Sequence, residues 1–437
     1  MRLRTGSPIR PSGRPLRTST LRALSLLVLA GLLALTGCEW ITGPDDPDPT
    51  PAQAITELPR DLTAAEVEAI RAGNAFGFDL LREVLAEARD ESVFLSPFSA
   101  SMALGMTMNG ADGATWDAMR STLRFDDLDE EEINASYRGL LDLLSDLDPH
   151  VEIAVGNAIW HRDALSVRAD FRERVEEAFD ARVQGLDFGD PGAADVINAW
   201  VRESTRDRID EMVQPPIPAQ VVAYLMNAVY FNAGWTVPFD VDQTRTQPFR
   251  ALDGTTQDAD FMIRDDTLRY NEGAEWQAVD LPYAGQAWAM TVVVPREGSS
   301  VHDLVETLDA DGWNALVDGF ETRRTMLSLP RFELEWEGVL NEPLERLGMG
   351  IAFDGSADFT RMFEGTSPWI DEVKQKSFVR VDEEGTEAAA VTSVTMVTSM
   401  PPEVRADRPF LFAIRERLSG TILFMGVIVE PPTIEGS

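Results

Sequence analysis

The chain has 437 residues, of which 44% are hydrophobic, and it carries a formal net charge of −36. This apolar fraction, together with ten tryptophans, is enough to build a substantial core, so a disordered chain is not expected. The charge argues against nucleic-acid binding, because phosphate contacts need clustered Lys and Arg side chains. An acidic balance of this size fits a well-solvated surface or a basic partner.

Residues 1–37 predict an export signal and are excluded from the fold. Six arginines precede an apolar run from Ala23 to Leu35, which is the layout of a secretory signal and is too short to span a bilayer comfortably. The run ends in Leu35-Thr36-Gly37-Cys38, which resembles the bacterial lipoprotein box. Cys38, the only cysteine, is then the expected lipidation site, and an ordinary signal peptide is the alternative. We expect export and lipid anchoring at the cell envelope, outer membrane or cell surface, or release outside the cell.

Residues 38–60 predict an extended tether between the lipidated cysteine and the folded part. The segment is rich in Pro and Asp and shows no periodicity. Asp45, Asp46 and Asp48 lack the glycine turn and terminal glutamate of a calcium loop, so we expect no metal there. No repeat or linker interrupts residues 61–432, which predicts a single domain.

Apolar periodicity predicts a mixed α+β fold, with helices crowded into the first half and strands into the second. The expected helices cover residues 62–88, a segment beginning at Ser96-Pro97, two segments within 168–212, and shorter ones within 301–317 and 340–347. One expected strand begins at Val151, and a second, expected to be buried on both faces, covers 221–231. The others cover AVDLPY near residue 278, 288–295, 326–336 and two runs at the C-terminus.

The stretch from Asp382 to Pro402 has conflicting propensities. An acidic run and a glycine lead into about fifteen residues of mostly Ala, Thr, Ser and Val, which mix helix formers with β-branched side chains. In a strand, alternate residues share one face, so a row of small side chains would lie on that face: Thr386, Ala388, Ala390 and Thr392. A flexible linker and an ordinary edge strand are the alternatives to a segment that inserts into a sheet.

No enzyme motif is present. The chain lacks a Gly-x-Ser-x-Gly elbow, a His-Glu-x-x-His helix, a phosphate loop and Cys/His metal spacing. His150, His161 and His302 are scattered, so packing or surface roles are favoured over a catalytic triad. Acidic residues are too numerous for counting alone to exclude a glycosidase pair.

Several motifs in order make the chain resemble the serpin family over residues 62–431: SVFLSPFSASMALGMTMNGADGAT, NAVYFNAGWTVPFD, VDLPYAG, LSLPRFELE, LERLGMGIAFDGSADFT, VDEEGTEAAAVTS and TILFMGVIVEP. The resemblance implies an α+β serpin fold with three β-sheets, about eight to nine helices and an exposed reactive loop at about 383–402. It also implies irreversible, suicide-substrate inhibition of serine proteases, in which the cleaved loop inserts into the main sheet while the protease is held as an acyl-enzyme.

The resemblance assigns roles within the loop. The hinge would comprise Glu384, Gly385, Thr386, Glu387, Ala388, Ala389 and Ala390. Counting along the loop places the reactive bond at Ser399–Met400, or alternatively at Thr398–Ser399. Both choices offer a small uncharged residue, which suits elastase-like or subtilisin-like proteases.

A sheet-opening cluster is also implied by the resemblance: Ser96, Ser99, Asn227 and Gln375, with Trp235 where insertion begins. Ordinary core packing is the alternative for each. Gln375 occupies a position where many members have histidine, and Ser92 one where many have asparagine. Since glutamine bridges by hydrogen bonds but does not titrate near neutrality, the departure puts pH-sensitive sheet opening in doubt.

The favoured interpretation is therefore a monomeric, surface-anchored bacterial serpin. Such a protein is not an enzyme and needs no cofactor. The net charge disfavours activation by a heparin-like polyanion. The alternative is a non-inhibitory serpin-fold lipoprotein with a binding or structural role.

Overall fold

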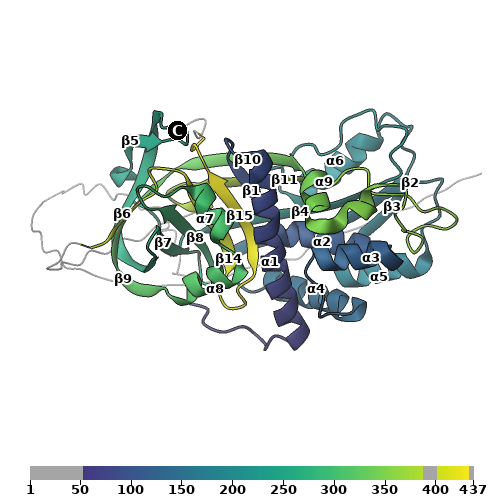
Figure 1. The fold of residues 1–437 in the computed structure, drawn as a ribbon, viewed down its shortest axis with the longest axis horizontal. Coiled ribbons are helices and arrows are strands. Elements are labelled where there is room, and N and C mark those ends of the chain that lie inside the picture. The colour runs from purple at the N-terminus through teal and green to yellow at the C-terminus, as the bar shows by residue number, and fades with distance from the viewer. Residues whose placement is uncertain (1–52, 387–400, 433–437) are drawn as a thin grey trace, which may run out of the picture. The chain divides into compact units, whose positions relative to one another are not determined.

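The computed structural model describes residues 53–386 and 401–432 (Figure 1). The signal peptide, Cys38, residues 387–390 of the predicted hinge and both candidate reactive bonds lie outside the described residues. The described residues belong to one compact unit. No helix among them is both long and apolar enough to cross a bilayer.

Nine α-helices are described in this part of the chain, which confirms the expected number. Capping boxes at Thr63/Glu66 and Asp129/Glu132 start two of them, and Ser96 caps a third that has proline at its first position. The helices are α1 (Ala64–Glu87), α2 (Pro97–Met108), α3 (Gly113–Thr122), α4 (Glu130–Ser145), α5 (Ala169–Phe179), α6 (Ala193–Ser204), α7 (Val301–Thr307), α8 (Ala310–Asp318) and α9 (Asn341–Leu344). Short 3₁₀ or π turns cover Val241–Gln243, Glu345–Met349 and Gly350–Phe353.

The described strands form three sheets, so the expected α+β fold with three sheets is confirmed. The largest contains β1 (Val93–Leu95), β15 (Ile422–Ile428), β14 (Phe410–Glu416), β8 (Trp288–Pro295), β7 (Trp276–Pro282), β6 (Thr256–Glu272), β9 (Glu321–Pro330) and β13 (Glu403–Arg405) in that order, with β5 (Arg245–Arg250) paired to β6. The second has the order β12 (Gly385–Thr386), β4 (Ala223–Gly234), β2 (Val151–Arg162), β3 (Arg182–Leu186). The third pairs β10 (Phe332–Val339) with β11 (Lys374–Val381).

Helix α2 connects these sheets through the core. It is buried over almost its whole length and contacts both β15 and β4, while α1 crosses β15 on the outside (Figure 1). A second apolar cluster joins α6 to β2 and β4 through Trp200, Trp160 and Met226. The sheets are therefore fixed to one scaffold of buried helices.

Several expectations about strands need correction. The run 326–336 is two strands, β9 and β10, and the strands β1, β3, β5, β6, β11 and β13 were not predicted. Strand β4 is covered on both faces, but most side chains from Ala223 to Val229 are only half-buried. The reason is that β12 covers only the last two residues of its edge.

Contact with the folded body begins before the predicted tether boundary at residue 60. The amide of Ile55 donates to the Gly285 carbonyl at 2.7 Å, and Ile55 and Leu58 pack against the core. Arg60 forms a salt bridge of 2.6 Å with Glu66 of α1. These contacts hold the end of the predicted tether on the domain.

Candidate functional site

The predicted hinge begins at a short ladder that we call the closed junction, formed by residues 382–386 and 233–235. In it, Gly385 pairs with Gly234 and Thr386 with Ala233. The Trp235 amide donates to the Glu384 carbonyl at 3.0 Å, and the Trp235 indole donates to the Asp382 carbonyl at 2.9 Å. The structure thus places Trp235 against the first hinge residues.

Gly385 has a backbone conformation that other residues resist. Its φ is +125°, and a Cβ built on it would lie 2.5 Å from the Trp235 amide nitrogen and 2.7 Å from the Ala233 carbonyl oxygen. Both neighbours are backbone atoms that cannot rotate away. Only glycine fits where the chain leaves β11 for β12.

A buried carboxylate reinforces the closed junction, and the sequence alone did not single it out. Glu383 is 5% exposed, accepts a hydrogen bond from the Thr244 hydroxyl, and lies 3.5 Å from the Arg331 guanidinium. Its neighbour Glu384 is exposed. In the acidic run Asp382-Glu383-Glu384 nothing distinguishes the buried member, so only the tertiary contacts reveal it.

Aromatic rings complete the junction. Trp235 stacks on Tyr283 with centroids 4.4 Å apart, and Phe239 meets it edge-on at 6.2 Å. Arg264 lies over the Phe239 ring at 4.2 Å, and burial lowers its pKa to about 10. The junction therefore combines backbone pairing, a buried ion pair and ring stacking.

The rest of β4 faces β11 without a ladder; we call its edge from Ala223 to Val229 the open edge. In the described part of the chain, the two strands share no backbone pairing along this edge, and they belong to different sheets. On its opposite edge, β4 pairs continuously with β2 from Ala223 to Ala233. A further strand could therefore add between β4 and β11 without breaking an existing ladder.

Four residues of the sheet-opening cluster lie together around the first turn of α2. The Gln375 side chain of β11 accepts from the Ser96 amide and donates to the Ser96 carbonyl, both at 3.0 Å. One turn later, the Ser99 hydroxyl donates to the Asn227 side chain of β4. Helix α2 thus holds each of the two strands by a separate polar contact.

The cluster extends to a residue that the sequence analysis missed. Asn227 donates to the Asn157 side chain of β2 at 2.6 Å, which in turn donates to the Phe179 carbonyl at 2.6 Å. Ser92 does not join the cluster, because its hydroxyl bonds to the Val429 amide and the Glu430 carbonyl near the end of β15. Trp235 lies separately at the closed junction.

Comparison with known proteins identifies this arrangement. A family model described as "Serpin (serine protease inhibitor)" matches residues 71–431. The chain belongs to the serpin family. It is 33% identical over 432 residues to an uncharacterized serpin-like protein of Thermococcus kodakarensis, covering 94% of this chain and 99% of that one.

Solved serpin structures share the fold. Native tengpin, a thermophilic serpin, matches with a TM-score of 0.77 at 28% identity, covering 87% of this chain and 97% of that one. Human thyroxine-binding globulin, crystallised with thyroxine, matches with a TM-score of 0.78 at 26% identity, over 85% and 100%. Since one such relative binds a small molecule, membership of the serpin family does not by itself establish protease inhibition here.

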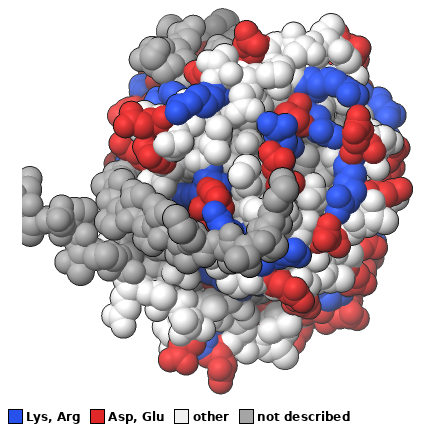
Figure 2. Space-filling view, turned by 90° about the vertical axis from the view of Figure 1, so that its left-hand side faces the viewer, with Lys and Arg blue, Asp and Glu red and all other residues white. Residues whose placement is uncertain are grey.

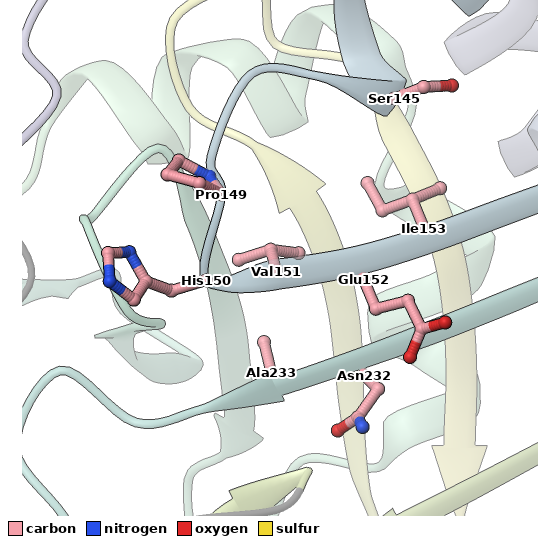
Figure 3. Close-up of a pocket in the computed structure, with 8 residues that line it drawn as sticks. All are labelled: Ser145, Pro149, His150, Val151, Glu152, Ile153, Asn232 and Ala233. Carbon is pink, nitrogen blue, oxygen red and sulfur yellow. The ribbon is translucent and has the colours of Figure 1, made fainter. Parts of the chain in front are cut away.

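One surface hollow of this serpin has both a serine and a histidine in its lining. Ser145, His150 and Glu152 line a cavity of about 350 Å³ beside the start of β2, where Ser145 and His150 point in different directions (Figure 3). His150 lies 3.5 Å from the buried Asp148, too far for a strong hydrogen bond. Among the described residues, no serine hydroxyl hydrogen-bonds to a histidine ring, and no group of three or more His, Cys, Asp or Glu could hold a metal ion.

The end of the serpin that carries β5, β6 and β9 has mixed charge. On the face drawn in Figure 2, arginines alternate with acidic residues and form no large patch of one sign. Pairs such as Arg324–Asp265 at 2.6 Å and Arg405–Glu403 at 3.1 Å account for part of this pattern. Exposed pairs of this kind contribute little to stability and would not concentrate a polyanion.

Proposed function

We propose that this serpin is an irreversible inhibitor of serine proteases that acts by loop cleavage, acyl-enzyme trapping and insertion of the loop between β4 and β11. Serpins generally target serine proteases, as the family description indicates. The observation that carries the proposal is the contrast along one strand edge. In the described residues, the edge of β4 pairs with β12 at Gly385 and Thr386 but has no strand partner along the open edge.

The sequence of residues 386–400 fits this role. About fifteen inserted residues at about 3.3 Å each would carry a tethered protease roughly 50 Å. New ladder bonds worth about 1 kcal/mol net apiece would release on the order of 10 kcal/mol, enough to distort a protease active site. The small side chains of the alternating row would meet little steric resistance.

The target and location follow from the sequence. Small uncharged residues at Ser399–Met400 or Thr398–Ser399 favour an elastase-like or subtilisin-like protease. Acylation of Cys38, the first residue of the predicted tether 38–60, would anchor the protein at the cell envelope. The serpin would then protect the cell surface from proteases in its surroundings.

Incubation of residues 39–437 with elastase and subtilisin tests this function. We expect a covalent adduct on a denaturing gel and a released C-terminal fragment, whose first residue identifies the reactive bond. Clean cleavage without an adduct, by these and by a broader panel of serine proteases, would contradict inhibition and favour the binding or structural role.

A matched pair of variants separates insertion from cleavage. Ala388→Glu places a charge on the face predicted to insert, whereas Ala389→Glu places the same charge on the opposite face. We expect Ala388→Glu to be cleaved as a substrate with little adduct and Ala389→Glu to form adduct like the wild type. Equal adduct from both variants would contradict insertion in this register.

A further inference from the structure

A second cavity lies at the far end of the open edge from the closed junction. Its volume is about 180 Å³, and it lies between the start of β4 and residues 359–374, which lead into β11. At roughly 10–15 Å³ for each water-sized position, it can hold about a dozen non-hydrogen atoms. Its lining is mainly apolar: Leu225, Met226, Phe359, Met362, Phe363 and Ile370.

The mouth of this cavity combines aromatic rings with two exposed acids. Trp369 is 52% exposed, although a large apolar ring of this kind usually packs. Tyr224 lines the same cavity, and Asp371 and Glu372 are exposed beside it. Burial raises the pKa of Tyr224, and the carboxylates of Glu372 and Asp371, which line the same cavity, raise it further.

No basic group in the described residues forms an ion pair with either of these two acids. Lys374, which also lines the cavity, is paired with Glu337 on β10. Arg162 is near enough to act on Tyr224, but its guanidinium donates to the carbonyls of residues 218, 219 and 221. In the described part of the chain, the carboxylates of Asp371 and Glu372 are therefore available to an external cation.

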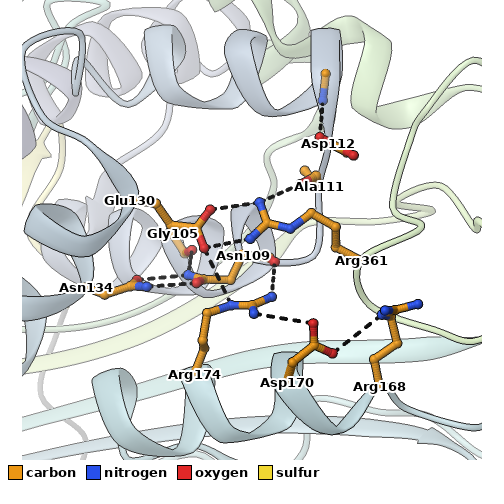
Figure 4. Close-up of polar contacts among 11 residues, drawn as sticks. Gly105, Asn109, Ala111, Asp112, Glu130, Asn134, Arg168, Asp170, Arg174 and Arg361 are labelled. Atoms are coloured by element: carbon orange, nitrogen blue, oxygen red, sulfur yellow. Dashed lines mark hydrogen bonds and ion pairs between the residues drawn. The ribbon is translucent and has the colours of Figure 1, made fainter.

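The wall that carries Met362 and Phe363 is held in place before any ligand arrives. Arg361 donates two bonds of 2.7 Å to Glu130 at the start of α4, and Arg174 of α5 lies 3.5 Å from the same carboxylate (Figure 4). The Arg168 amide donates to the Met362 carbonyl at 3.0 Å. A preformed wall lowers the entropic cost of binding.

We propose that this cavity binds a small organic cation, an apolar or aromatic group that carries a quaternary ammonium. The ring of Trp369 would face the cation, the acids would supply the opposite charge, and the apolar part would fill the cavity. A quaternary ammonium has no N–H groups to satisfy, so it needs no hydrogen-bond acceptor from the apolar side chains of the lining. The phosphate of a zwitterionic lipid headgroup would be repelled by the acids, so the ligand is a free molecule. Binding does not depend on protease inhibition.

Calorimetry with the full chain and two isosteric probes tests the proposal. We expect 3-(trimethylammonio)phenol to bind at least tenfold more tightly than the neutral 3-tert-butylphenol. Trp369→Ala, and separately Asp371→Asn/Glu372→Gln, should each weaken the cation at least tenfold. Only the latter should leave the neutral probe unchanged.

A control addresses the large net charge of the chain, which attracts any cation. Glu176→Gln/Glu177→Gln removes the same charge from an exposed pair on α5 and should leave the affinity unchanged. Equal affinity for the two probes, equal loss in the control, or binding only to phosphatidylcholine vesicles would overturn the proposal.

Discussion

The two ends of one strand edge, the closed junction and the open edge of β4, differ in what holds them. At the closed junction, backbone pairing at Gly385, the buried Glu383 and the Trp235–Tyr283 stack act together. Along the open edge, the described polar contacts of α2 are those of Ser99 with the Asn227 side chain and of the Ser96 backbone with the Gln375 side chain. The difference shows that the edge of β4 is paired where residues 385–386 meet it and has no strand partner, among the described residues, from Ala223 to Val229.

The largest expected loss of stability comes from adding a side chain at Gly385. Gly385→Ala should destabilise the native state by about 3 kcal/mol, because the new Cβ meets backbone atoms and alanine resists this φ. Gly298→Ala is the matched control, since Gly298 has a φ of +94° but nothing within 4 Å of a built Cβ. Thermal unfolding of both variants separates the cost of the steric clash from the cost of holding alanine at a positive φ. Similar losses in both would contradict a tight fit at the junction.

Removing the buried charge of Glu383 should lower the stability less than Gly385→Ala does. Glu383→Gln leaves Arg331 half-buried without its ion pair, so we expect a loss of about 2 kcal/mol in unfolding free energy. Glu384→Gln changes the exposed neighbour and should cost less than about 0.5 kcal/mol. Chemical denaturation measures both, and equal effects would show that burial of Glu383 does not strengthen the junction.

The smallest effect is a pH dependence introduced at the open edge. In Gln375→His, a neutral imidazole can accept from the Ser96 amide, but the protonated ring cannot. Burial and loss of this bond would place the folded-state pKa below the unfolded value of about 6.5, so stability is retained above that pH and lost as pH falls. We expect the unfolding free energy to drop by about 1–2 kcal/mol more than in wild type between pH 8 and pH 5. His161 is also buried, and burial lowers its pKa. It titrates in both proteins, so its contribution cancels when the change in unfolding free energy of the wild type is subtracted from that of the variant.

Most helices and strands were predicted from the sequence, and those that were missed have weaker local patterns. Helix α1 and strands β8, β14 and β15 have strong apolar patterns and were predicted at nearly their observed bounds. Strands β5 and β6 were missed, because their side chains alternate weakly and are partly exposed. Their pairing comes from tertiary contacts that no local pattern records.

Some residues of the candidate site were predicted from the sequence and others were not. The motifs marked Ser96, Ser99, Asn227, Gln375 and Trp235, and the structure places the first four around α2. Glu383 and Asn157 were not distinguished, because burial of one acid among three, or of one amide in a strand, depends on partners distant in sequence. The resemblance implied the hinge and the sheet-opening cluster, but the difference between the two ends of the β4 edge is visible only in the fold.

The most direct test measures the separation of the strands that flank β4 and β11. Cys38 is the only cysteine, so residues 39–437 with Glu152→Cys and Glu335→Cys can carry one spin label each on β2 and β10. Insertion of a strand should lengthen the label distance by about 5 Å after loop cleavage. We predict this increase in the cleaved wild-type sequence and its absence in cleaved Ala388→Glu. An unchanged distance after cleavage of the wild-type loop would contradict insertion between β4 and β11.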